Sequence, residues 1–269
     1  MLNFVVALPC EAKPLIRHYR LKKRRDCHAF PVYLNAHIAL IVSGSGKTSA
    51  AAACAFLQVY TGNRSDAVWI NLGIAGHSNA EVGTMFVVDK ITDAETLHNW
   101  YPQSVFKVGL PSACLKTVAC VEKEYSEALL YDMEAAGFYP TALRFSTAEL
   151  VHCIKLVSDN AVSGRSEITR AWVTELMTAA VESVVLFASE LLDIAAQITS
   201  DDCDQALQAI LQKAHFSQSQ SQQLNQLLKR YQILSGEPQM PVEIWQNTNS
   251  SREILKRAST LLDNQPVNF

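Results

Sequence analysis

The chain has 269 residues, of which 49% are hydrophobic, and its formal net charge is −3. This length fits one large domain, or a domain of roughly 200 residues with an appendage, and the apolar content excludes a disordered chain. The small net charge gives no general electrostatic reason to expect nucleic acid or an anionic membrane as a partner.

The cysteines and the first residues indicate a cytoplasmic protein. There are seven cysteines, an odd number, and none forms a C-x-x-C pair, so we expect free thiols and neither disulfides nor a zinc site. The first apolar run is short and stops at Pro9, which is typical of a strand and not of a signal peptide. No apolar run approaches the ~20 residues that a membrane span needs, so no membrane span is expected.

Apolar strands and helical patterns interleave along the first 198 residues. In chain order the sequence predicts strand Phe4–Leu8, helix Glu11–Tyr19, strands Phe30–Asn35 and His37–Ser43, helix Ser49–Tyr60, strand Ala67–Leu72 with a Gly73–Gly76 turn, strands Gly83–Ile91 and Leu115–Val121, helix Met133–Phe145, strand Leu150–Val157 and helix Glu167–Ile198. Continuous apolar strands between helices predict an α/β sheet covered by helices on both sides.

The composition changes at Thr199. Glutamine and serine become dense, glycine nearly vanishes and leucines recur at helical spacing. We therefore expect domain 1–198 to be followed by a helical extension, 199–269, of two or three amphipathic helices with a break at Ser235–Pro238. This extension is interpreted either as a helical cap on the main domain or as a surface for a partner.

Four carboxylates follow or precede the predicted strands at points where a ligand could reach them. Glu11 and Asp159 come shortly after predicted strands. Asp132 and Glu134 stand at the start of a predicted helix, and small residues follow them directly. In open α/β sheets ligands bind beyond the carboxyl ends of the strands. Each of these acids also has a structural interpretation as a helix cap or a first-turn acid.

The glycine-rich string Gly44–Thr48 invites comparison with a nucleotide triphosphatase loop. That loop needs a glycine five positions before Gly46, where this chain has Ile41 inside a predicted strand. We therefore do not interpret the string as a phosphate-binding loop.

Five segments together resemble the purine nucleoside phosphorylase and nucleosidase superfamily, and most of all its methylthioadenosine/S-adenosylhomocysteine nucleosidase branch. They are similar to that branch's opening strand and acidic turn, its S-G-x-G-K turn, its N-x-G-x-A-G and V-G-D segments, its E-M-E-x-A sugar clamp and its I-S-D-x-A base-binding end. In this chain they are Ala7–Ala12, Ser43–Lys47, Ile70–Gly76 with Val82–Thr84, Asp132–Ala135 and Leu156–Ala161.

The resemblance implies a three-layer α/β/α fold with a central mixed sheet, followed by C-terminal helices. It implies cleavage of the N-glycosidic bond of a purine nucleoside or a 5′-modified relative, without cofactor or metal, in a possible homodimer. Glu11 would activate water, Asp159 would protonate or hydrogen-bond the purine, and Glu134 would hold the ribose hydroxyls. The remaining substrate-binding positions would be Met133, which packs against the sugar, with Asp132, Gly76, Ile74 and Ser158.

The chain departs from the family in two places. Asn71 and Ile74 stand where the phosphorylase branch has an arginine and a serine that bind phosphate, which disfavours phosphorolysis without removing it as an alternative. The stretch 88–132 is shorter than in the family, and Val121 and Glu122 stand near the place of the base-stacking aromatic. A protein that binds a nucleoside or a partner without turnover therefore remains a second interpretation.

Overall fold

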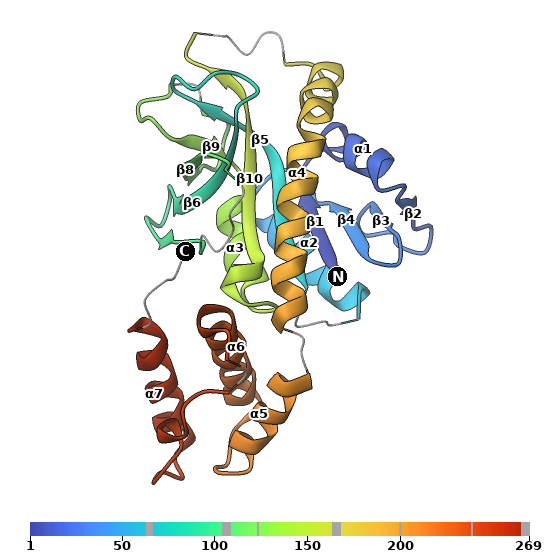
Figure 1. The fold of residues 1–269 in the computed structure, drawn as a ribbon. Coiled ribbons are helices and arrows are strands. Elements are labelled where there is room, and N and C mark those ends of the chain that lie inside the picture. Colours follow the sequence, from blue (N-terminus) through green and yellow to red (C-terminus); the bar gives the residue numbers. More distant parts are fainter. Residues whose placement is uncertain are drawn as a thin grey trace. The chain divides into compact units, whose positions relative to one another are not determined.

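The computed structural model describes residues 1–62, 67–103, 109–122, 124–162, 168–198, 201–237 and 239–264. Within the chain there are two compact units, Met1–Leu192 and Asp193–Phe269 (Figure 1). The sequence-based domain boundary at 198/199 stays a prediction. Glu167, the predicted first residue of the long helix, lies outside the described residues.

The first unit alternates strands and helices as the sequence predicts. Its elements are β1 (Leu2–Val6), α1 (Pro9–His18), β2 (Lys22–Lys23), β3 (Val32–Leu34), β4 (Ile38–Val42), α2 (Lys47–Tyr60), β5 (Val68–His77), β6 (Met85–Asp93), β7 (Asn99–Trp100), β8 (Ser112–Thr117), β9 (Leu130–Asp132), α3 (Ala135–Ala142), η1 (Ala148–Leu150), β10 (Val151–Asn160) and α4 (Arg170–Ile198).

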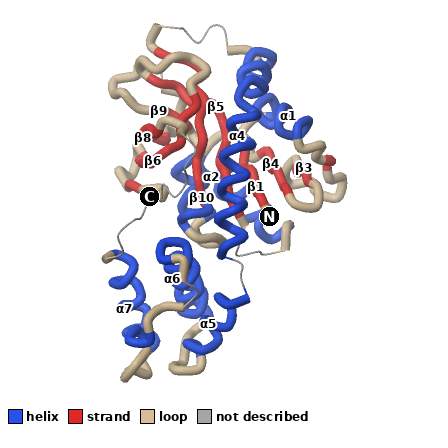
Figure 2. The backbone as a smooth tube through the Cα atoms, viewed as in Figure 1, coloured by secondary structure: helices blue, strands red, loops and turns tan. Residues whose placement is uncertain are grey.

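One mixed sheet runs through this unit in the order β10-β6-β8-β9-β5-β1-β4-β3-β2, and β7 pairs with β6. The pairs β1–β4, β1–β5 and β5–β10 are parallel, whereas β6–β10, β3–β4 and β5–β9 are antiparallel. In Figure 2, α4 crosses one face of the sheet, while α2 and α3 lie on the other. The predicted three-layer α/β/α class with a mixed sheet is confirmed.

Part of the sheet closes on itself. β5 pairs with β10 as well as β9, and the chain of pairs β10–β6–β8–β9 returns to β5. β5 therefore has neighbours on both edges. Its second half forms a closed ring of five strands together with β10, β6, β8 and β9. Closure removes free strand edges from the ring, except along β5 between Asn71 and Gly76, where neither β1 nor β9 pairs with it.

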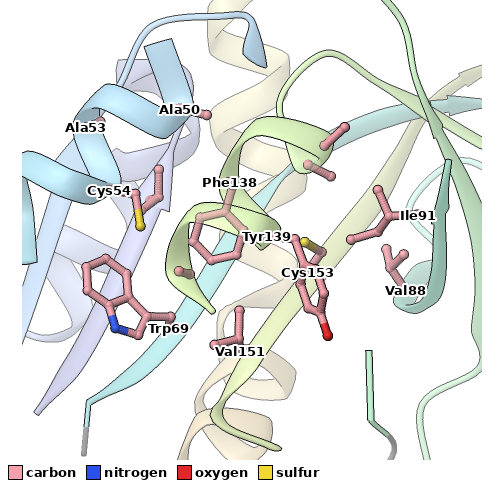
Figure 3. Packing of buried hydrophobic residues seen from close by; sticks show 14 of the residues in the cluster. Ala50, Ala53, Cys54, Trp69, Val88, Ile91, Phe138, Tyr139, Val151 and Cys153 are labelled. Carbon is pink, nitrogen blue, oxygen red and sulfur yellow. The ribbon is translucent and has the colours of Figure 1, made fainter. Parts of the chain in front are cut away.

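Alternate residues of the central strands face the two helical layers. Val5 belongs to the core cluster that also contains residues of α2 and α3. The residue before it, Phe4, packs toward α1, because its ring centroid lies 6.1 Å from that of Tyr19, directly after that helix. Figure 3 shows the packing between the sheet and helices α2 and α3, where Cys54 and Trp69 lie with Phe138 among buried apolar residues. This period of two is the expected pattern for strands buried on both faces.

The segment Gly73–Gly76 differs from its prediction as a turn. It continues β5 as a strand, because β10 pairs with β5 from Trp69 to His77 and supplies backbone partners across the glycines. Glycine in a strand marks a close approach of another group. Here a Cβ at Gly73 would lie 3.0 Å from Oε1 of Glu11.

The second unit is helical. It contains α5 (Asp201–Leu211), α6 (Gln218–Ser235), η3 (Val242–Ile244) and α7 (Ser251–Asp263) around its own apolar core. Ser217 caps α6 and Gly236, at φ +74°, ends it in the left-handed conformation. Over the described residues it has three α-helices, within the predicted two or three, and α6 ends at Ser235, where the predicted break Ser235–Pro238 begins.

The small residue Gly137 has a packing role that the sequence did not reveal. A Cβ at this position would lie 2.6 Å from the carbonyl carbon of Lys47, at the first residue of α2. Because the opposing atoms are backbone, neither α2 nor α3 can relieve the clash by a rotamer change.

We expect Gly137→Ala to destabilise the first unit by about 2 kcal/mol, since overpacking outweighs the helix propensity that alanine gains. The free energy of unfolding in urea measures this. Gly109→Ala is the matched control, because nothing lies within 4 Å of a Cβ there, and its effect should stay within about 0.5 kcal/mol. Equal effects of the two substitutions would contradict the close helix approach.

Candidate active site

The candidate site lies where β5 exchanges one neighbour for another. On this edge β1 pairs with Val68–Asn71 and β9 pairs only with Gly76 and His77. Between them the backbone N–H of Ile74 donates to Oε1 of Glu11 at 2.9 Å. A side-chain carboxylate thus takes the place of a missing strand partner, as a buried N–H requires.

Glu11 is held by two backbone donors. It lies in the first turn of α1, where Pro9 begins the helix, and its Oε2 accepts the N–H of Leu8 at 2.8 Å. The side chain is 2% exposed. Burial raises the pKa of Glu11 to about 7, although the two backbone donors and the charge of Lys155 act against that rise. A carboxyl with this pKa can exchange a proton near neutral pH.

Glu134 connects the start of α3 to the glycine-rich turn. Its Oε1 accepts the N–H of Gly46 at 2.9 Å, and its Oε2 accepts the N–H of Met133 at 3.3 Å. Gly46 has φ +104°, a conformation that favours glycine. The role of the Gly44–Thr48 string is therefore to present a backbone donor to a carboxylate. Burial and the nearby Asp132 raise the pKa of Glu134, while Lys155 opposes them.

Asp132 belongs to a buried network centred on Lys155. Its carboxylate lies 2.8 Å from Lys155 Nζ, accepts the hydroxyl of Thr117 at 2.7 Å and accepts the N–H of Ala135 at 2.9 Å. Both charged side chains are almost fully buried. Burial alone would lower the pKa of Lys155, but attraction to Asp132 and Glu134 outweighs it and raises that pKa. The network thus places one positive charge close to the carboxylates of Asp132 and Glu134.

Asp159 lies near the end of β10, beside Gly76, its register partner on β5. Its Oδ1 accepts the hydroxyl of Ser158 at 2.6 Å, and its Oδ2 accepts the hydroxyl of Tyr125. The strand register shifts between Val157 and Asp159, which marks a bulge at Ser158. A bulge re-aims the side chains beside it.

These side chains line one cavity of about 250 Å³. All eight residues singled out from the sequence border it: Glu11, Ile74, Gly76, Asp132, Met133, Glu134, Ser158 and Asp159. Val121 and Glu122 border it as well. Among the lining residues that the structure describes, acids are numerous and neither lysine nor arginine occurs.

Three residues of the site escaped the sequence analysis. Lys155 interrupts the apolar run of β10, and a charge within a buried strand is a signal that could have revealed it. Thr117 and Tyr125 carry no such signal, because their positions depend on pairing between β8, β9 and β5. Asn71 does not border the cavity; its amide donates to the carbonyl of Val5 at 3.1 Å.

The fold is similar to that of solved nucleosidases. The 5′-methylthioadenosine nucleosidase of Arabidopsis thaliana aligns over 70% of this chain and 95% of its own, with 19% identity and a TM-score of 0.57. The 5′-methylthioadenosine/S-adenosyl homocysteine nucleosidase of Campylobacter jejuni aligns over 70% and 98%, with 16% identity and a TM-score of 0.56. The chain has the nucleosidase fold.

A futalosine hydrolase mutant from Helicobacter pylori shares this nucleosidase fold too, with 12% identity over 71% of this chain and 98% of its own and a TM-score of 0.53. No family model and no curated protein matches the sequence. The likeness therefore concerns the nucleosidase fold, and the substrates of these proteins remain theirs.

Over the described ranges, no group of three or more histidine, cysteine, aspartate or glutamate side chains could hold a metal ion. In the same ranges no helix has the length and apolarity that crossing a bilayer requires.

We expect Lys155→Met to destabilise the first unit by about 3–5 kcal/mol, because it leaves the buried charge of Asp132 unpaired. Chemical denaturation followed by circular dichroism measures the loss. The double variant Lys155→Met/Asp132→Leu should recover part of it, since no lone charge is then buried. A single variant as stable as the natural chain would refute the ion pair.

The raised pKa of Glu11 predicts a pH-dependent stability. Its carboxyl binds a proton more tightly in the folded chain, at about 7, than at its ordinary 4.5, so this contribution is full below about pH 4.5 and is lost as the pH rises to about 7. Relative to Glu11→Gln, the natural chain should lose about 3 kcal/mol between pH 4.5 and pH 8. Parallel urea titrations test this, and a constant difference between the two proteins would contradict the assignment.

Proposed function

We propose that this protein hydrolyses the N-glycosidic bond of a purine nucleoside or a 5′-modified relative. The observation that carries the proposal is the convergence of Glu11, Glu134 and Asp159 on one cavity of a nucleosidase fold. In the proposed mechanism each acid has a separate task, and its surroundings suit that task.

Cleavage of this bond develops positive charge on the ribose and negative charge on the base. Glu134, fixed by the Gly46 N–H, supplies a carboxylate oriented for the ribose hydroxyls and for the developing cation. Glu11, with a pKa of about 7, takes a proton from the attacking water. Asp159, beside Gly76 on the neighbouring strand, protonates or hydrogen-bonds the purine as the glycosidic bond breaks and the base takes the bonding electrons.

Lys155 limits the rise in the pKa of the acids in this site. Its charge acts on Glu11 and Glu134 and lowers the pKa of both against the effect of burial. Without it, the pKa of each acid would lie further above its ordinary value. Lys155 is therefore assigned a positioning and electrostatic role, through Asp132, and does not border the cavity.

The lining of the cavity favours hydrolysis over phosphorolysis. Binding phosphate calls for cationic groups, and the described lining residues include neither lysine nor arginine. Ile74, at the position where the phosphorylase branch places a serine, offers an apolar side chain and an N–H that Glu11 already takes.

The cysteines support a cytoplasmic location for this activity. Side chains are described for six of them, and all six are free thiols. Free thiols of this number are typical of a reducing compartment.

We expect release of free base from one of methylthioadenosine, adenosylhomocysteine, inosine or adenosine without phosphate. Glu134→Gln should lower kcat at least 100-fold while the circular dichroism spectrum stays the same, because the sugar loses its carboxylate. Glu175→Gln, at an exposed position of α4, is the matched control and should match the natural chain. Chromatography of the released base measures the rates.

A requirement for phosphate would restore phosphorolysis, and equal rates for the two glutamine variants would remove Glu134 from the mechanism. Saturable binding by calorimetry without base release would support the second candidate, a nucleoside-binding protein.

A further inference from the structure

Tyr125 lies in the connection between β8 and β9 and projects onto the end of the cavity bordered by Asp159. Its hydroxyl donates to Oδ2 of Asp159. Its ring lies against the backbone of Gly76, where a Cβ would come within 2.6 Å of Tyr125 Cζ. The ring centroid is 5.4 Å from that of Tyr131 on β9. Tyr125 thus contacts both strands of the pair that joins Gly76 to Asp159.

The contacts of Tyr125 coincide with the part of the cavity assigned to the base. Gly76 offers bare backbone and Asp159 offers a carboxylate that accepts hydrogen bonds. A phenol ring with its hydroxyl on that carboxylate has the shape and the donor of a small aromatic ligand. A base and the Tyr125 side chain therefore compete for the same space and the same acceptor.

We propose that Tyr125 is a specificity-determining residue that occupies the base end of the cavity until a base with its own N–H donor displaces it from Asp159. The proposal rests on the proposed function for the identity of the ligand. Because Oδ2 of Asp159 accepts the phenol hydroxyl, a ring that presents acceptors alone cannot take over this hydrogen bond. Adenine, which carries N–H donors, meets this requirement.

Competition of this kind lowers the apparent affinity for the ligand. When only a fraction of the molecules has an open site, the apparent Kd rises by the inverse of that fraction. Removing the Tyr125 hydroxyl abolishes its hydrogen bond to Asp159 but keeps the ring, so the open fraction grows. Removing the ring as well takes away the contact with Gly76 and vacates the space.

The test is calorimetric titration of the full chain with adenine. We expect Tyr125→Phe to lower Kd about tenfold, which corresponds to about 1.4 kcal/mol, and Tyr125→Ala to lower it further. Tyr101→Phe, at an exposed tyrosine outside the cavity lining, is the matched control and should leave Kd unchanged. In the base-release assay KM should fall for Tyr125→Phe while kcat stays within about twofold.

An unchanged Kd in Tyr125→Phe would overturn the proposal. A higher Kd would overturn it too, because it would mean that Tyr125 binds the base and does not compete with it. A fall in kcat without a fall in KM would likewise show that the hydroxyl serves the reaction.

A second measurement separates this proposal from the proposed function. The unfolding equilibrium of the ligand-free chain is determined for Tyr125→Phe, Asp159→Asn and the double variant. Contact between the two side chains predicts effects that fail to add, by about tenfold in the equilibrium constant, and additive effects would overturn the occupancy. A non-additive cycle together with no binding of adenine by any variant would support the occupancy and overturn the nucleosidase proposal alone.

Discussion

The site depends on one constraint, the exchange of partners along a single edge of β5. β1 leaves this edge after Asn71 and β9 reaches it only at Gly76, so the backbone between them lacks a strand neighbour on this edge. A buried N–H without a partner is costly, and the carboxylate of Glu11 supplies the partner for Ile74. The same split in the sheet makes room for the cavity. Glu11 therefore both satisfies the sheet backbone and borders the cavity.

The positive charge of Lys155 offsets part of the negative charge of the site. The acids that border the cavity outnumber its cations, and Lys155 is the buried base that pairs with Asp132 and acts on Glu11 and Glu134. Burial is the largest cause of the raised pKa of Glu11 and of Glu134. Repulsion between the acids raises the pKa of Glu11 by less. Asp132 thus contributes to the site through its ion pair and its bond to Ala135 N–H as well as through the cavity wall. The cap interpretation and the functional interpretation of this residue are compatible.

Much of the architecture could be predicted from local patterns. Buried runs such as Ile38–Val42 and the glycine-rich turn are short-range signals, and they located strands and turns within a few residues. Gly73–Gly76 was wrong as a turn, because the pairing that straightens it comes from β10, more than seventy residues later. The short range of such patterns also explains why Tyr125 was missed. Its place beside Asp159 follows from the route of the connection between β8 and β9, and no feature of the residue itself announces it.

Pairing between distant segments also governs the order in which this unit can be assembled. Trp69 on β5 is aligned with Val151 on β10, so the five-stranded ring cannot close before the chain has been synthesised beyond that point. Until then a nascent chain exposes one edge of β5, and such edges recruit other chains. Helix α2, which follows β4 directly, can cover one face of β1 and β4 early, but it leaves that edge bare. Folding of this protein on the ribosome is therefore expected to be slow at one defined step, the arrival of β10.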